Sequence, residues 1–262
     1  MKQVPASLSW LGLLIGIALL SPASAQATAL GVAPLLVCAN DECQDLSPYM
    51  VPGAGDQTNF DVRATFRGSE LHLVGVFDTD PFITFGATTT NLVTGPTTFA
   101  FLFGTPIVPG FYNTATSLGI VSVTNEQGET ATVATSAIYP TFISGYGTVG
   151  LSPTNLGVDL GTASCVATGP GGTTVCNQGT ASNTFAPTFY DNLEALLTYT
   201  QSGLGSVASW SGTVTLTAEA RVPEPASLLL VASGALGLMA GARGWTRTVR
   251  RRRERPAAQR RD

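Results

Sequence analysis

Two neighbouring stretches, Phe60-Asp-Val-Arg-Ala-Thr-Phe66 and Glu70-Leu-His-Leu-Val-Gly-Val-Phe77, contain the pattern that decides the fold. Apolar and polar residues alternate along most of both stretches, and this period of two is typical of a half-buried β-strand. Arg67-Gly68-Ser69 lies between them and has the composition of a turn. The two stretches therefore predict an antiparallel hairpin.

Short stretches of the same kind recur along residues 26–221 and are separated by turn residues, such as Asn125-Glu126-Gln127-Gly128. Thr, Val, Gly and Phe are abundant there, and charged helical faces are almost absent. We therefore predict an all-β fold, an antiparallel β-sandwich that is jelly-roll-like. The further expected strands are Phe82–Phe85, Thr97–Phe103, Leu118–Thr124, Thr130–Ile138, Phe142–Val149 and Ser209–Glu219.

The segment Tyr190–Thr200 fits two patterns. Leu193, Leu196 and Leu197 have helical spacing, whereas Leu193, Ala195, Leu197 and Tyr199 alternate as in a strand. The all-β surroundings favour the strand.

Residues 26–221 are strongly acidic, although the whole chain has a formal net charge of −4. Three arginines stand against fourteen Asp and Glu in this range, which is a balance of −11. Like charges repel, so this balance argues against nucleic acid and against anionic polymers as direct partners. Neutral glycans, or anionic glycans bridged by Ca²⁺, stay compatible with it.

The N-terminal residues predict export. Lys2 supplies positive charge, an apolar core runs from Leu8 to Leu20, and Ala23-Ser24-Ala25 is a small-residue cleavage site. We therefore expect a signal peptide over residues 1–25 and a mature protein that starts at Gln26.

The C-terminal residues predict a membrane anchor. Ala226 to Ala242 is a run of seventeen uncharged residues, which at about 1.5 Å per residue spans roughly 26 Å of a ~30 Å hydrocarbon core. Nine of the twelve arginines follow it, and such a cluster fixes the C-terminus in the cytoplasm. We predict a transmembrane helix over 226–242 and a basic tail over 243–262, in preference to a buried core helix or a nucleic-acid-binding arm.

Pro223-Glu224-Pro225, the apolar run and the arginine cluster together resemble the PEP-CTERM sorting signal of Gram-negative bacteria that export polysaccharide, over about residues 222–255. Asp80-Pro-Phe-Ile-Thr-Phe-Gly86, Thr90-Asn91 and Phe99 to Pro109 also look like sandwich ectodomains that precede such tails. The resemblance implies processing by exosortase, a membrane transpeptidase. It also implies passage through the inner membrane to the cell surface or the extracellular space.

Four cysteines, Cys38, Cys43, Cys165 and Cys176, fit an oxidising compartment. Three pairings are possible. We expect Cys38 with Cys43 and Cys165 with Cys176, because each pair brackets loop-like residues and the pairs lie far apart in the chain. Such small closed loops would mainly rigidify loops.

Asp78-Thr79-Asp80 is the best candidate cation site, because two carboxylates two residues apart in a loop suit Ca²⁺. The remaining ligands of a calcium loop are missing, so solvated turn acids are the alternative. Asp41, Glu42 and Asp45 beside Cys43 permit the same two interpretations. Phe111, Tyr112, Tyr146 and Trp210 are candidates for stacking on sugar rings, with core or rim positions as the alternative.

His72 is the only histidine, and no nucleophile elbow of the G-x-S-x-G type occurs, so a catalytic triad is not expected. Three functions stay open. We favour a non-enzymatic surface or matrix protein that associates with exopolysaccharide, as in a biofilm. A glycan-binding sandwich is the second. A secreted hydrolase is the third, and it requires two convergent carboxylates in a cleft.

Overall fold

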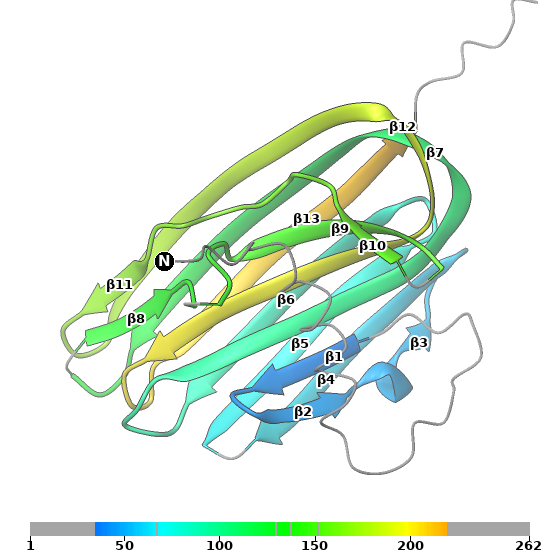
Figure 1. The fold of residues 1–262 in the computed structure, drawn as a ribbon. Helices are drawn as coiled ribbons and strands as arrows, with labels where there is room; N and C mark the ends of the chain where they lie inside the picture. The colour runs from blue at the N-terminus through cyan, green and yellow to red at the C-terminus, as the bar shows by residue number, and fades with distance from the viewer. Residues whose placement is uncertain (1–34, 67, 129, 137, 151, 219–262) are drawn as a thin grey trace, which may run out of the picture. The chain divides into compact units, whose positions relative to one another are not determined.

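The computed structural model describes residues 35–66, 68–128, 130–136, 138–150 and 152–218. Within these ranges the only helical element is the short 3-10 helix η2 (Ser47–Tyr49), and the rest of the regular structure is strand (Figure 1). All pairings between strands are antiparallel. The strands are β1 (Leu35–Ala39), β2 (Glu42–Asp45), β3 (Val51–Pro52), β4 (Gln57–Phe66), β5 (Ser69–Asp78), β6 (Phe82–Asn91), β7 (Thr97–Asn125), β8 (Thr130–Ala134), β9 (Ile143–Val149), β10 (Ser152–Asn155), β11 (Cys165–Thr168), β12 (Gly172–Ser202) and β13 (Val207–Ala218).

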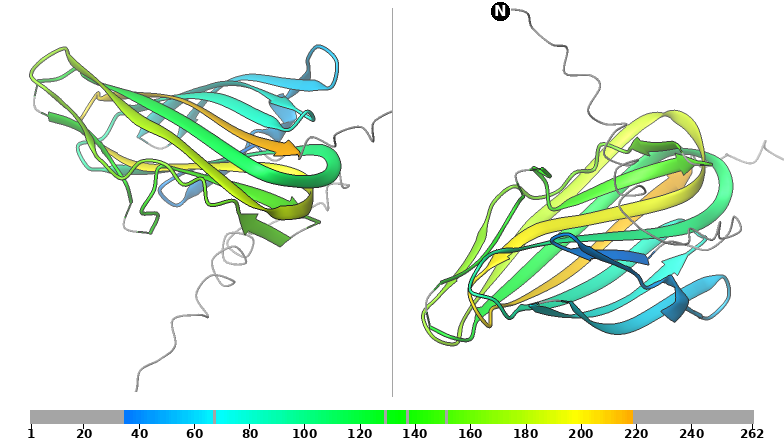
Figure 2. Two further views of the ribbon diagram at one scale, coloured as in Figure 1. Left: turned by 90° about the horizontal axis from the view of Figure 1, so that it is seen from above. Right: turned by 60° about the horizontal axis from the view of Figure 1, so that its bottom comes forward.

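The strands form two layers that face each other, and the long strands β7 and β12 run through both (Figures 1 and 2). The broad sheet contains β3, β4, β5, β6, β13, the second half of β7 and the first half of β12. The narrow sheet contains β2, β1, the first half of β7, the second half of β12, β9 and β10, with β8 and β11 at one end. This arrangement confirms the predicted all-β class and fits a β-sandwich.

Both long strands bend where they leave one sheet for the other. The register between them is interrupted at Thr184/Thr188 and at Tyr190/Asn192, opposite a stretch of β7 that holds Pro106 and Pro109. Proline has no N–H for the ladder, and bulges of this kind sharpen the local bend of a strand. The strands predicted over Thr97–Phe103 and Leu118–Thr124 are both confirmed, but they are the two halves of one long strand, which was not predicted.

The core between the sheets is rich in aromatic rings. Phe85 of β6 and Phe103 of β7 stack with ring centroids 4.4 Å apart, and Phe60 and Phe77 pack against Phe103 from β4 and β5. All four side chains are buried. Burial of one such side chain stabilises the fold by roughly 1.5–3 kcal/mol, so this cluster is a main source of stability.

Several local predictions are confirmed. Phe66 pairs with Ser69 across the β4–β5 turn, where Gly68 has a φ of +83° that favours glycine. Tyr190–Thr200 is strand, as part of β12. The strand expected over Thr130–Ile138 ends earlier, at Ala134. The strands β1, β2, β3, β10 and β11 and residues 172–189 of β12 were not predicted.

Three predicted segments lie outside the described residues: the signal peptide (1–25), the motif Pro223-Glu224-Pro225, and the transmembrane helix (226–242) with its basic tail. Among the described residues, no helix has the length and hydropathy needed to cross a bilayer.

Candidate ligand-binding surfaces

The first disulfide joins Cys38 to Cys43, as predicted. The two residues are direct partners in the β1–β2 hairpin, with their Cα atoms 4.0 Å apart. Asn40 in the turn has a φ of 51°, in the left-handed region that asparagine tolerates better than most residues. The bridge therefore fastens a pair of strands and not an irregular loop.

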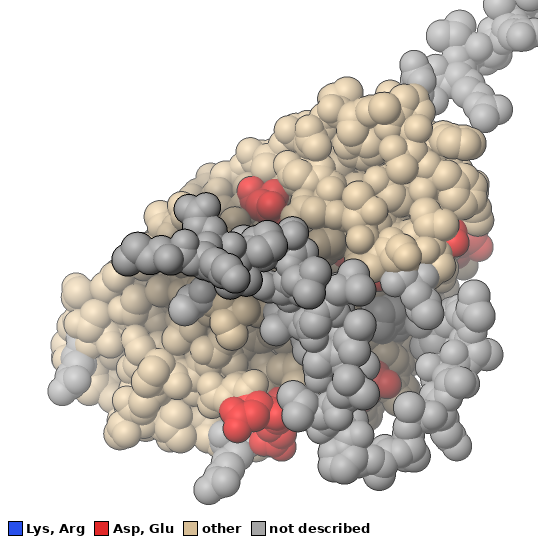
Figure 3. Space-filling view, viewed as in Figure 1, with Lys and Arg blue, Asp and Glu red and all other residues tan. Residues whose placement is uncertain are grey.

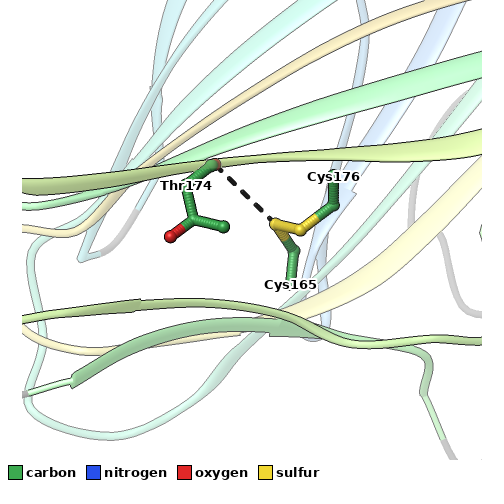
Figure 4. Close-up of a disulfide and its surroundings, with 3 residues drawn as sticks. All are labelled: Cys165, Thr174 and Cys176. Carbon is green, nitrogen blue, oxygen red and sulfur yellow. Dashed lines mark hydrogen bonds between the residues drawn. A yellow bond between two sulfur atoms is a disulfide. The ribbon is translucent and has the colours of Figure 1, made fainter.

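The second disulfide joins Cys165 to Cys176, also as predicted, with Cα atoms 5.8 Å apart. Cys165 is buried on β11, which pairs with β8 of the narrow sheet, whereas Cys176 is on β12 beside β7 in the broad sheet. Figure 4 shows the bridge between the two strands and the contact from the Cys165 sulfur to the carbonyl oxygen of Thr174 at 3.8 Å. This disulfide links the two layers and does more than rigidify a loop.

The predicted cation site lies in the turn between β5 and β6. One Asp78 carboxylate oxygen accepts a hydrogen bond from the Asp80 backbone N–H at 2.9 Å, and the other accepts one from Gln57 Nε2 at 3.0 Å. In the described part of the chain, no group of three or more His, Cys, Asp or Glu side chains is placed to hold a metal ion. The geometry therefore gives Asp78 a structural role in the turn.

His72 lies on the outward surface of the broad sheet. Its Nε2 is 2.7 Å from Asp61 Oδ1 on the neighbouring strand β4. An ionised carboxylate only accepts hydrogen bonds, so the imidazole Nε2–H is the donor in this contact. His72 also borders a surface depression of about 300 Å³ over β4, β5 and β6, which we call the β4–β6 hollow.

Next to this hollow, the outward surface of the broad sheet is covered by hydroxyl groups. We call the outward side chains of β6, β13, the second half of β7 and the first half of β12 the polar face. Hydroxyl groups on neighbouring strands form hydrogen bonds with each other, as between Thr88 Oγ1 and Ser209 Oγ at 3.1 Å and between Thr124 Oγ1 and Thr173 Oγ1 at 3.0 Å. The hydroxyl-bearing residues of the polar face are Thr84, Thr88, Thr90, Thr114, Thr116, Ser122, Thr124, Thr173, Thr180, Ser182, Thr184, Ser209, Ser211, Thr213, Thr215 and Thr217.

The polar face carries no charged side chain among its described residues. The described residues as a whole contain one arginine, Arg63, against twelve Asp and Glu, which is a balance of −11 with His72 neutral. On the side of the molecule drawn in Figure 3, the carboxylates form small groups that stand apart. The lack of charge distinguishes the polar face from the rest of the described domain, which is strongly acidic.

Two of the four aromatic candidates are core residues, because Trp210 and Tyr112 are buried. Burial, with a smaller effect from the Asp80 charge, raises the pKa of Tyr112. Tyr146 is half-buried. Phe111 is 56% exposed at the bend of β7 and forms an edge-to-face pair with Phe189 of β12, with ring centroids 5.7 Å apart.

Among the described carboxylates, Glu194 is the one whose pKa is raised by burial. It lies on β12 of the narrow sheet, where Thr148 Oγ1 donates a 3.0 Å hydrogen bond to it. Burial raises the pKa of Glu194 above its ordinary value, and the Thr148 bond partly offsets this rise.

Neither a family model nor a curated protein matches this chain. TmCBM61, solved in complex with β-1,4-galactotriose, matches with a TM-score of 0.23 and 8% identity, over 57% of this chain and 88% of its own. The enzymatically active domain of tailspike protein 4 from Bacteriophage CBA120 matches with a TM-score of 0.26 and 14% identity, over 57% of this chain and 19% of its own. At these values neither likeness indicates a function for this chain.

Sequence reasoning did not find the polar face or the β4–β6 hollow. Residues Thr173–Thr184 of β12 were not predicted to be strand, so the sequence did not indicate that their hydroxyl side chains lie beside those of β7. The signal that was present is the repeated Thr or Ser at every second position, as in Ser209, Ser211, Thr213, Thr215 and Thr217.

Proposed function

We propose that this chain is an exported, non-enzymatic protein of the cell surface or extracellular matrix that associates with neutral exopolysaccharide. The observation that carries the proposal is the polar face: a broad, uncharged, hydroxyl-covered sheet surface on a domain that is otherwise strongly acidic.

The physical reason is the cost of removing groups from water. A polymer that covers charged side chains must desolvate them, whereas hydroxyl groups exchange water for sugar hydroxyls at little net cost. The aliphatic side chains Leu118, Ile120 and Val175 are exposed between the hydroxyls and offer contact to the C–H faces of sugar rings. An anionic polymer is repelled by the acidic surroundings of the face.

The proposal includes the route by which the protein leaves the cell. Pro223-Glu224-Pro225, the apolar run and the arginine cluster supply a PEP-CTERM-like sorting signal, with exosortase as the processing partner and the inner membrane as the transit compartment. The two disulfides support an oxidising environment for the folded domain.

The glycan-binding module is the second candidate, and it differs in requiring a site that recognises particular sugars. The β4–β6 hollow favours it, because the hollow brings charged and hydroxyl side chains together beside the polar face.

The experiment is affinity electrophoresis of the full chain in detergent, in gels that contain extracellular polysaccharide from the producing cells, separated by anion exchange into neutral and anionic fractions. The neutral fraction should retard the chain, and the anionic fraction should not. Mobility unaffected by the neutral fraction would refute the proposed association.

A further inference from the structure

The β4–β6 hollow differs from the polar face beside it in carrying charge. Its lining includes Arg63, Thr65, Glu70, His72, Thr88 and Thr90. Its volume of about 300 Å³ lies at the small end of the range of ligand pockets, ~300–1,000 Å³. Arg63 is the only arginine, and His72 the only histidine, among the described residues.

The hollow and the polar face are joined by the register of the sheet. Arg63 of β4 lies opposite His72 of β5, His72 lies opposite Thr88 of β6, and Thr88 lies opposite Ser209 of β13. The same row continues to Ser122 of β7. A polymer that lies across the polar face along this row therefore reaches the hollow.

The hollow presents hydrogen-bond donors and acceptors, and the imidazole among them is held in place. The 2.7 Å contact between Asp61 Oδ1 and Nε2 holds the imidazole of His72, and the other ring nitrogen is a further polar group of the hollow. Within the described residues, no carboxylate lies within ion-pair distance of Arg63, so its guanidinium donors stay available to a ligand. Glu70 supplies acceptors, and the threonine hydroxyls supply both kinds of group.

The charges of the hollow fit a neutral ligand better than an ion. The positive charge of Arg63 is offset by the negative charges of Asp61 and Glu70, so the hollow has no excess of positive charge to attract an anion. A sugar ring offers adjacent hydroxyls that donate to a carboxylate and accept from a guanidinium, and bonds to charged partners are the stronger ones.

We propose that the β4–β6 hollow is the subsite that recognises one sugar unit of the neutral polysaccharide. The polar face then contacts the sugar units that follow along the polymer. This inference rests on the proposed association with neutral polysaccharide and, by placing in the hollow a site that recognises particular hydroxyls, favours the glycan-binding module as the form which that association takes. A site that reads hydroxyls discriminates strongly against a ligand that lacks them, because its polar groups are then left unpaired.

The test uses the full chain and the neutral polysaccharide fraction, hydrolysed to oligosaccharides. Because the sequence has a single histidine, the imidazole Cε1–H gives one NMR signal that can be assigned to His72 without ambiguity and reports on the hollow itself. Titration should shift this signal with saturation. Arg63→Ala and Glu70→Gln should each weaken the affinity at least about tenfold, and Arg63→Lys should restore only part of it.

Asp41→Asn is the matched control, because it removes an acidic charge from the exposed β1–β2 turn of the narrow sheet and should leave the affinity unchanged. Thermal melting of each variant checks that the fold is intact. If the chain binds the neutral fraction but the imidazole signal does not move and both hollow variants bind like the parent, the subsite is refuted and the proposed function stands. If the neutral fraction does not bind at all, both fail.

Discussion

The Tyr199 hydroxyl on β12 donates a 2.8 Å hydrogen bond to Thr89 Oγ1 on β6, so a buried bond joins the two sheets across the core. Thr89 in turn donates to Gln201 Oε1 at 2.6 Å, and Gln201 Nε2 donates to the Ser206 carbonyl at 2.7 Å. Burial raises the pKa of Tyr199 far above its ordinary value, so the phenol stays protonated and remains a donor at any ordinary pH.

Tyr199→Phe tests this link between the sheets. It removes the donor while Thr89 keeps its bond to Gln201, so we expect a loss of about 0.5–1.5 kcal/mol of unfolding free energy. Thr89→Val should lower the free energy of unfolding more than Tyr199→Phe does, because it leaves both the Tyr199 hydroxyl and Gln201 Oε1 without this buried partner. Urea denaturation of both variants measures the difference. Equal stability of Thr89→Val and the parent would contradict the account.

The two disulfides should contribute differently to stability. The sequence separations are 11 for Cys165–Cys176 and 5 for Cys38–Cys43. For loops of this size, loop-closure entropy predicts that each disulfide adds roughly 2–3 kcal/mol to the free energy of unfolding, and the longer loop adds more. Replacing Cys165 and Cys176 by Ala also leaves space in the core at Cys165, which is fully buried. The melting midpoint should therefore fall further for this double variant than for the double variant Cys38→Ala, Cys43→Ala. The reverse order would be inconsistent with a bridge between the layers.

Glu194 predicts a dependence of stability on pH. Its pKa is raised in the folded protein, so the folded state disfavours the ionised form. Its contribution is therefore most favourable below the ordinary pKa and is lost as pH rises through the folded value. Glu194→Gln should raise the melting midpoint at pH 7 and have little effect at pH 3. Asp56→Asn, at an exposed position, serves as control. A midpoint difference that is constant with pH would exclude this explanation.

The hairpin around Gly68 was predictable because alternation and turn chemistry are both local. The bend of β7 was not, because Pro106, Pro109 and Gly110 have the same composition whether a strand ends there or crosses from one sheet to the other. Whether the strand ends there or crosses is decided by its pairing with β12 on both sides of the bend. That pairing joins residues far apart in the chain, so local sequence does not reveal it.

The candidate site was harder to predict than the fold. The cysteine pairs follow from spacing, but the link that Cys165 makes between the layers depends on the sheet to which β11 belongs. The hollow requires that Arg63, His72 and Thr88 lie opposite one another on three strands, which only the register shows. Asp78 and Asp80 were selected by proximity alone, and the structure shows a bond from the Asp80 backbone to Asp78.

Processing at the tail is a separate prediction. We expect intact-mass measurement of protein released from the cell surface to show that everything beyond Pro223-Glu224-Pro225 is absent. Protein recovered at the surface with Arg250 to Arg253 still attached would refute processing and leave only an anchor. Replacement of Glu224 by Ala should keep the chain in the membrane fraction.

Contact between the polar face and neutral polysaccharide can be measured by hydroxyl-radical footprinting of the full chain with and without the neutral fraction. Leu118, Ile120 and Val175 are exposed in the polar face, whereas Val149 of β9 and Val166 of β11 are exposed on the narrow sheet and serve as internal controls for radical scavenging. The account predicts that oxidation of the first three side chains falls relative to the two controls when polysaccharide is bound. An equal change in oxidation at all five positions, under conditions where the chain is bound, would contradict it.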